Sequence, residues 1–280
     1  MFSKGLVRVF GPGKIGIGVI HLAPLPGSPG YEGDLESIVG RAVAEAGAME
    51  RVGFSGLIVE NYGDIPFEAG PAGAGAIASM AVVARAVRDA VDLPMGINVL
   101  RNDAGSALAI AGVCGCEFIR VNVLVGAFVT SEGIIEGRPA EVLRQREALA
   151  PESLILADIM VKHGTPLADT TIREQALDAA ERGRADCIIV TGRRTGLPPL
   201  AEDLTEARDA LEGGTRPVPV LAGSGATPSN LESLLNLSDG VIVGSYIRKG
   251  GVAGSELDAE RVEEVGGILK KFKGRTGDRR

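Results

Sequence analysis

Short, almost wholly apolar runs recur along the chain, separated by longer segments in which apolar residues return every three or four positions. Continuous apolar runs of this length are typical of parallel strands that are covered on both faces. They occupy residues 15–22, 56–60, 95–100, 118–123, 154–159, 187–190, 218–222 and 240–243. Because they start about 22 to 40 residues apart, each leaves room for a following helix, and we predict a (β/α)8 TIM barrel of the α/β class. A doubly wound open sheet is the alternative.

The segments between the runs carry helical patterns. Leu35, Ile38, Val39, Ala42, Ala46 and Met49 fall on one helical face, and Asp34 precedes them as an N-cap. Residues 76–91, 141–149, 172–182, 204–211 and 262–272 show similar patterns. Thr227-Pro228 places a capping residue before a first-turn proline, which predicts a helix start. No linker-like change of composition divides residues 1–280, so we expect a single domain.

Composition narrows the class of protein. The 280 residues are 45% hydrophobic but only 4% aromatic, so aliphatic packing must build the core. No apolar stretch reaches about 18 residues and no secretion signal is evident, so we expect a cytoplasmic protein without membrane insertion. A net charge of −7 argues against nucleic-acid binding. We interpret the basic residues of about 270–280 as a frayed tail, and Cys114, Cys116 and Cys187 as reduced, buried thiols.

Polar side chains gather where the predicted strands end, which is where active sites of (β/α)8 barrels lie. Both histidines of the chain are among them. Other polar residues at these ends include Asp64, Arg101, Asn102, Arg193, Arg194 and Thr195. We take as catalytic candidates Glu60, Asp158, Lys162 and His21. As substrate-binding candidates we take Asn61, Asn98, Arg120, Asn122, His163 and Thr191.

The chemistry of the lysine and the carboxylates allows three interpretations. Lys162, desolvated among apolar neighbours, would have a lowered pKa and act as a base or a Schiff-base nucleophile. Alternatively, Lys162 is ion-paired with Asp158 or Glu60. In the third interpretation Glu60, Asp158 and Asp103 hold a divalent cation, since carboxylate oxygens are its preferred ligands. We predict no other cofactor.

The glycines, 40 in all, are about twice as frequent as in an average protein. Gly223, Ser224 and Gly225 follow the seventh predicted strand and lead toward the Thr227-Pro228 helix, and Gly244 and Ser245 follow the eighth. Glycine lets backbone N–H groups approach an anion, and a helix N-terminus adds further donors. Because loops after strands seven and eight often bind phosphate in this architecture, we predict a phosphate site there. The alternative is that these are tight turns that only serve barrel closure.

Seven stretches of the sequence resemble one known family. They are residues 18–29 (GVIHLAPLPGSP), 59–67 (VENYGDIPF), 96–104 (GINVLRNDA), 118–122 (FIRVN), 133–137 (GIIEG), 157–163 (ADIMVKH) and 190–196 (VTGRRTG). Together they are similar to the BtpA/SgcQ family over nearly the whole chain. Small departures occur at Ala23, at Tyr62 and at Ser131-Glu132.

The resemblance implies a barrel of the ribulose-phosphate-binding type, in a family named for a protein of photosystem I biogenesis. Two hypotheses follow. In the first, the chain binds and acts on a phosphorylated small metabolite, a sugar phosphate or a nucleotide-like compound, as a lyase, an isomerase or a glycosyl-bond-cleaving enzyme. In the second, it is a non-catalytic assembly or stability factor that uses the barrel as a scaffold. A homo-oligomer is expected in either case.

Overall fold

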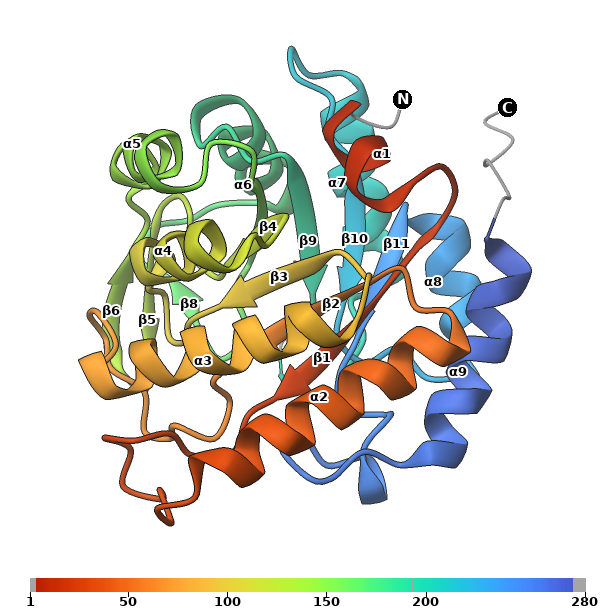
Figure 1. The fold of residues 1–280 in the computed structure, drawn as a ribbon. Helices are drawn as coiled ribbons and strands as arrows, with labels where there is room; N and C mark the ends of the chain where they lie inside the picture. The colour runs from red at the N-terminus through yellow and green to blue at the C-terminus, as the bar shows by residue number, and fades with distance from the viewer. Residues whose placement is uncertain (1–3, 193, 274–280) are drawn as a thin grey trace.

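Eight parallel strands close into a barrel in the computed structural model, which describes residues 4–192 and 194–273 (Figure 1). Around the barrel the order is β1 (Ile15–His21), β11 (Gly240–Val243), β10 (Val220–Gly223), β9 (Cys187–Thr191), β7 (Leu154–Ile159), β4 (Phe118–Val121), β3 (Met95–Asn98) and β2 (Gly56–Glu60). Each of the eight apolar runs supplies one of these strands. The predicted TIM barrel is confirmed, and the open-sheet alternative is wrong because β1 pairs with both β11 and β2.

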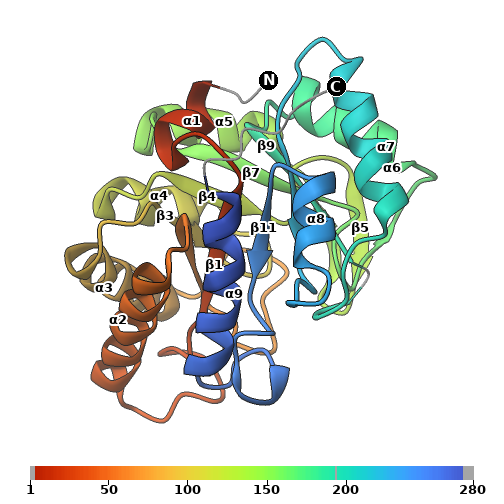
Figure 2. The same cartoon turned by 90° about the vertical axis from the view of Figure 1, so that its right-hand side faces the viewer.

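Helices cover the outside of the barrel between successive strands (Figure 2). They are α2 (Leu35–Val52), α3 (Ala74–Ala90), α4 (Ala104–Cys114), α5 (Pro139–Leu149), α6 (Ile172–Leu177) with its π-helical continuation η1 (Asp178–Arg182), α7 (Ala201–Glu212), α8 (Leu231–Leu237) and α9 (Ala259–Phe272). Asp34 caps α2 as predicted, because its side chain accepts the Ser37 backbone N–H at 2.9 Å. The predicted helix start at Thr227 is wrong. The Asn230 side chain accepts the Thr227 N–H at 2.8 Å and closes a turn, and α8 begins only after it.

Several elements have no counterpart among the predictions. They are α1 (Lys4–Phe10), α4, the short 3-10 turn η2 (Lys249–Gly251), and a small antiparallel sheet of β6 (Gly133–Glu136), β5 (Ala127–Thr130) and β8 (Thr165–Pro166). The β5–β6 hairpin is inserted between β4 and α5, at the carboxyl end of the barrel strands (Figure 1). Residues 270–272 of the predicted basic tail belong to α9, and 274–280 lie outside the described residues.

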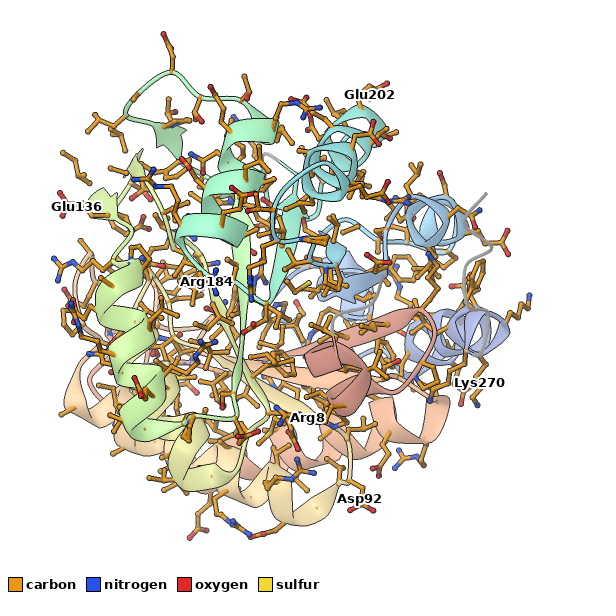
Figure 3. The ribbon with its side chains drawn as sticks, turned by 90° about the horizontal axis from the view of Figure 1, so that it is seen from above. Arg8, Asp92, Glu136, Arg184, Glu202 and Lys270 are labelled. Atoms are coloured by element: carbon orange, nitrogen blue, oxygen red, sulfur yellow. The ribbon has the colours of Figure 1, made fainter. Side chains whose placement is uncertain are left out.

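The alternation of side chains along each strand divides the core into two layers. Inward residues such as Ile17, Ile189 and Ile242 fill the barrel, while the residues between them pack against the helices. At the amino-terminal end α1 lies across the opening, with Leu6 in the barrel core (Figure 3). One turn further along α1, the Phe10 ring packs on Phe118, 5.4 Å between centroids. This end is therefore filled by apolar side chains.

The structure bears on two further predictions, the state of the cysteines and the expectation of no membrane insertion. All three cysteines are buried and unpaired, as predicted, and burial raises the pKa of Cys116 to about 12. A thiol with that pKa is not a nucleophile near neutral pH. Within residues 4–192 and 194–273, no helix is long and apolar enough to cross a membrane.

Two glycine substitutions test the packing. A Cβ at Gly96 would lie 2.1 Å from the Phe118 ring inside the barrel, whereas one at Gly267, on the exposed side of α9, would meet nothing within 4 Å. We predict that Gly96→Ala destabilises the protein by about 1–3 kcal/mol because the ring must shift. Gly267→Ala should stabilise it by roughly 0.5–1 kcal/mol through helix propensity. Urea unfolding of both variants measures this, and equal effects would contradict the packing described here.

Candidate functional site

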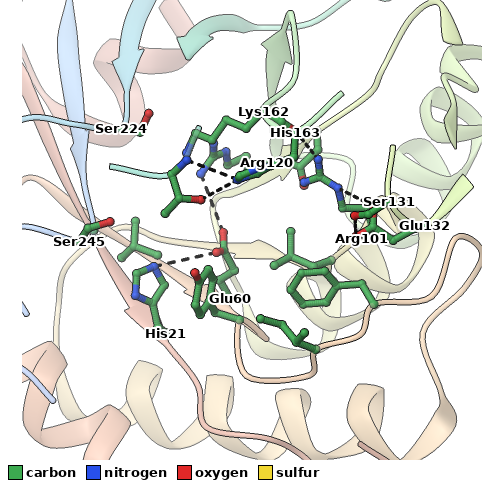
Figure 4. Close-up of a pocket in the computed structure, with 18 of the residues that line it drawn as sticks. His21, Glu60, Arg101, Arg120, Ser131, Glu132, Lys162, His163, Ser224 and Ser245 are labelled. Carbon is green, nitrogen blue, oxygen red and sulfur yellow. Dashed lines mark hydrogen bonds and ion pairs between the residues drawn. The ribbon is translucent and has the colours of Figure 1, made fainter. Parts of the chain in front are cut away.

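A cavity of about 490 Å³ opens at the carboxyl end of the barrel (Figure 4). That volume lies within the range of small-molecule sites. Among the sequence-predicted site residues, those that line it are His21, Glu60, Arg120, Asn122, Lys162, His163, Ser224, Gly244 and Ser245. The fold thus brings three of the four catalytic candidates, His21, Glu60 and Lys162, and part of both glycine loops to one cavity, whereas Asp158 does not line it.

The buried Arg120 side chain, on β4, is held between two carboxylates. Its Nε and one terminal nitrogen donate to the two oxygens of Asp158, both at 3.0 Å, and its other terminal nitrogen is 3.8 Å from Glu60. Asn122 donates a further hydrogen bond to Asp158 at 2.8 Å. The Asp158 carboxylate is therefore fully engaged inside the barrel.

Glu60, at the end of β2, is positioned by an amide and faces a histidine. Asn98 Nδ2 donates to Glu60 Oε2 at 2.6 Å, and Glu60 Oε1 lies 4.0 Å from His21 Nε2. The parallel register explains this, since His21, Glu60 and Asn98 are direct cross-strand partners on β1, β2 and β3. Glu60 is a buried carboxylate at the cavity wall, where it could accept a proton from a ligand in the cavity.

His21 is held as a neutral imidazole. Its Nδ1 accepts the Gly254 backbone N–H at 3.2 Å, so the ring proton is on Nε2, the nitrogen nearer Glu60. Burial, together with the charges of Arg248 and Lys162, lowers the pKa of His21 well below its usual value. Neutral His21 can donate a hydrogen bond to a ligand oxygen from Nε2.

A buried ion network stands behind His21. Arg248, fully buried, donates to Glu45 Oε1 and to the Val19 carbonyl, both at 2.6 Å. Arg41 also reaches Glu45 at 3.2 Å, and it donates to the carbonyls of His21 and Gly254 at 2.9 and 3.3 Å. The loop that carries Gly254 is thereby tied to β1 and α2.

Lys162 has no carboxylate partner. No acidic side chain of the described residues lies within ion-pairing distance of its Nζ, since Asp158 pairs with Arg120. Burial, followed by the charge of Arg120, lowers the pKa of Lys162 to about 8. The alternative in which Lys162 pairs with Asp158 or Glu60 is therefore wrong.

The two glycine loops meet the cavity through Ser224 and through Gly244 and Ser245. Among the residues that the structure describes, no atom accepts a hydrogen bond from the backbone N–H groups of Gly225, Gly244 or Ser245. Gly244 lies against His21, where a Cβ would come within 3.2 Å of the ring. These free donors are what an anion would need, whereas the start of α8 does not line the cavity.

The family model of the BtpA family matches residues 13–271. This chain belongs to the BtpA family. An uncharacterized protein of Methanocaldococcus jannaschii is 42% identical over 92% of this chain and 95% of its own length. The photosystem I biogenesis protein BtpA of Synechocystis is 44% identical over 88% of this chain and 84% of its own.

Solved structures with the same fold are more distant in sequence. Tryptophan synthase of Mycobacterium tuberculosis matches with a TM-score of 0.61 and 14% identity, over 94% of this chain and 98% of that chain. N-(5′-phosphoribosyl)anthranilate isomerase of Pyrococcus furiosus matches with a TM-score of 0.56 and 13% identity, over 92% and 100%. At these identities the likeness shows that the BtpA-family chain is a TIM barrel.

Other predicted site residues of this BtpA-family barrel lie behind the cavity wall. Asn61 accepts the Leu100 backbone N–H at 2.7 Å and donates to Asp64 at 3.0 Å, so it braces two loops. Thr191 donates to the Met160 carbonyl at 3.4 Å. Asp158 and Asn98 act on the cavity through Arg120 and Glu60. Their direct contact with a ligand stays a prediction.

Two glycines of the predicted phosphate site have a packing explanation instead. A Cβ at Gly223 would lie 2.3 Å from Ile189, and one at Gly225 would lie 2.1 Å from the Pro198 backbone. Neither lines the cavity. For these two positions, the tight-turn alternative accounts for the glycine.

The predicted cation site is not assembled. Asp103 caps α4, accepting the Ser106 N–H at 3.0 Å and the Ala72 N–H at 2.9 Å, and lies away from the cavity lining. Within the described part of the chain, no group of three His, Cys, Asp or Glu side chains is placed to hold a metal ion. Arg193 lies outside the described residues.

Several residues that line the cavity were not among the site residues predicted from the sequence. Ser131 and Glu132, at the tip of the β5–β6 hairpin, line it together with Tyr62 and residues 65–67. The hairpin has a sequence signal, because two short β-branched runs flank Ser131-Glu132 and Gly133. The Arg248–Glu45 pair has no such signal, since its partners are far apart in the chain.

The neutral state of His21 makes stability depend on pH. The unfolded chain takes up a proton near pH 6.5 while folded His21 does not, so acidification below pH 6.5 favours unfolding. We predict that His21→Gln lessens the stability lost between pH 6.5 and 5, as measured by urea unfolding. His163→Gln, at the only other histidine and a more exposed one, is the matched control and should have a smaller effect. Identical slopes for His21→Gln and the unaltered chain would contradict a neutral His21.

Proposed function

We propose that this BtpA-family barrel binds a phosphorylated small molecule in the cavity at the carboxyl ends of its strands and acts on it as an enzyme. One observation carries the proposal: the unpaired backbone donors of Gly244 and Ser245 and an unpaired Lys162 share a cavity with Glu60 and His21. Such a cavity suits a ligand with an anionic end and a reacting end. A cytoplasmic location and a homo-oligomeric state stay predictions from the sequence.

The phosphate end would lie at Ser224, Gly244 and Ser245. Backbone N–H groups bind phosphate oxygens without carrying a net charge of their own. The name of one structural neighbour, N-(5′-phosphoribosyl)anthranilate isomerase, is consistent with a phosphorylated ligand in this fold. At 13% identity they support the site only by analogy.

The reacting end would face Glu60, Lys162 and His21. Uncharged Lys162 can take a proton or attack a carbonyl carbon, Glu60 can move a proton, and His21 Nε2–H can donate to the developing oxyanion. Proton transfer beside a carbonyl and imine formation both start from such groups. We therefore favour isomerase or aldolase-type lyase chemistry, with glycosyl-bond cleavage as a further candidate.

Binding of phosphate esters is the first test. Ribose 5-phosphate or a nucleoside monophosphate, at about 100 times its Kd, should stabilise the chain by ~2.7 kcal/mol and raise Tm by several degrees. Ser245→Asp places a negative charge at the phosphate end and should abolish the shift.

Ser37→Asp makes the same chemical change at an exposed position outside the cavity, and it should keep the shift. If no phosphate ester stabilises the unaltered chain, the proposal is refuted and the scaffold hypothesis gains.

The lowered pKa of Lys162 gives a second test. An amine with a pKa of about 8 is half uncharged at pH 8, whereas an exposed lysine is charged until about pH 10.4. Reductive methylation with formaldehyde, followed by mass spectrometry of peptides, should therefore label Lys162 with a midpoint near pH 8. Exposed Lys270 serves as the reference within the same sample. Labelling of Lys162 that rises only in parallel with Lys270 would contradict an unpaired amine with a lowered pKa.

A further inference from the structure

Two hydrogen-bond acceptors in the cavity have no partner. Among the described residues, the buried side-chain atoms without one are Ser28 Oγ, Glu45 Oε2, Asn122 Oδ1, Glu132 Oε2 and Arg248 Nε. Of these residues, only Asn122 and Glu132 line the cavity, and both offer an oxygen. Because buried polar atoms almost always find a partner, a pair of unpartnered acceptors in one cavity points to a ligand that donates to them.

The orientation of Asn122 is fixed by its other end. Its Nδ2 donates to Asp158 at 2.8 Å, and the amide cannot be reversed, because Oδ1 would then face a carboxylate oxygen. The Asn122 side chain is only 5% exposed. Its Oδ1 is therefore held at the cavity wall as an acceptor only.

Glu132 is held in place from the hairpin side. Ser131 donates to Glu132 Oε1 at 2.9 Å, and the Glu132 backbone N–H donates to Thr130 Oγ1 at 3.3 Å. Although burial opposes it, these hydrogen bonds and the charge of Arg101 keep the pKa of Glu132 below its usual value. The carboxylate is therefore ionised at neutral pH.

Arg101 does not use up the free oxygen of Glu132. Its Nε lies 3.6 Å from Glu132 Oε2, which is too long for a hydrogen bond, and its terminal nitrogen donates to the Lys162 carbonyl. The ion pair thus orients Glu132 Oε2 and leaves it able to accept from a ligand.

Apolar and aromatic side chains also line the cavity. They are Tyr62, residues 65–67 and Leu100, and flat side chains of this kind favour a flat ligand group. Figure 4 shows Arg101 and Glu132 on the opposite side of the cavity from Ser224 and Ser245. A ligand with its phosphate at the serines would extend its other end toward Glu132.

We propose that the Glu132 end of the cavity is a specificity subsite for a planar group bearing N–H or O–H donors. This rests on the proposed function, since it places the phosphate at the other end. The ligand class is then a phosphate ester whose far end is a flat, donor-bearing ring, such as an aminated heterocycle. Glu132 and Asn122 select for it because their oxygens stay unpaired without such donors.

Calorimetric titration tests the subsite. The probes are adenosine, guanosine and cytidine 5′-monophosphates, each compared with ribose 5-phosphate, which lacks the ring. We expect one or more of the nucleotides to bind at least about tenfold tighter than ribose 5-phosphate. Glu132→Leu should remove this advantage, so that no nucleotide binds that variant more than about twofold tighter than ribose 5-phosphate does, while Glu132→Gln, which keeps an acceptor, should retain part of it.

Glu136→Leu is the matched control, since Glu136 is an exposed glutamate of the same hairpin that does not line the cavity. It should leave all affinities unchanged, and thermal unfolding checks that each variant folds. If ribose 5-phosphate binds but no nucleotide binds tighter, or if Glu132→Leu has no more effect than Glu136→Leu, the subsite is overturned and the proposed function stands. If none of the four phosphates binds, the proposed function itself fails.

Discussion

Arg120 lies inside the barrel between the carboxylates of Asp158 and Glu60, and the polar layer at the carboxyl end depends on that pairing. A buried ion pair is stable only when hydrogen bonds satisfy its remaining polar atoms. Asn122 and Asn98 supply them, one to each carboxylate. The cost of desolvating the two carboxylates is thus offset within the barrel. Lys162, the other cation nearby, is left without an acidic partner, so burial and then the charge of Arg120 lower its pKa to about 8.

The result is an uneven distribution of charge around the cavity. The carboxylates of Asp158 and Glu60 are engaged by protein groups, whereas the Lys162 amine and the backbone N–H groups of Gly244 and Ser245 are not. His21 adds a donor but no charge, because burial keeps it neutral. An anion at the Gly244 loop would supply the missing acceptors, and it would do so without displacing an existing salt bridge. In the proposed function, this imbalance would favour an anionic ligand over a neutral one, because only an anion would pair with the unpaired amine.

Much of this could be predicted from the sequence because the relevant signals are local. Strands buried on both faces are apolar throughout, so all eight could be located, and polar residues at their ends mark the cavity. Pairing across the barrel could not be predicted in this way. Whether Asp158 forms an ion pair with Arg120 or with Lys162 depends on how far each side chain extends between neighbouring strands. The role of Gly225 could not be predicted either. In the sequence it suggests a phosphate-binding loop, but in the structure its missing side chain allows close contact with the Pro198 backbone. A glycine pattern alone does not separate these two causes.

The loop after β11 links the two ends of the proposed chemistry. It carries Ser245 at the phosphate end, and further along it carries Gly254, whose N–H fixes the tautomer of His21. Between them Arg248, fully buried, anchors the loop to Glu45 of α2 and to the Val19 carbonyl of β1. The anchor leaves Arg248 Nε and Glu45 Oε2 unpartnered, so it is not the arrangement that stability alone would favour. A charged anchor does, however, fix direction as well as distance, because its hydrogen bonds are directional. It therefore holds Ser245 and His21 in one geometry. In the proposed function, a ligand bound by its phosphate at Ser245 would meet an imidazole already in the donating form.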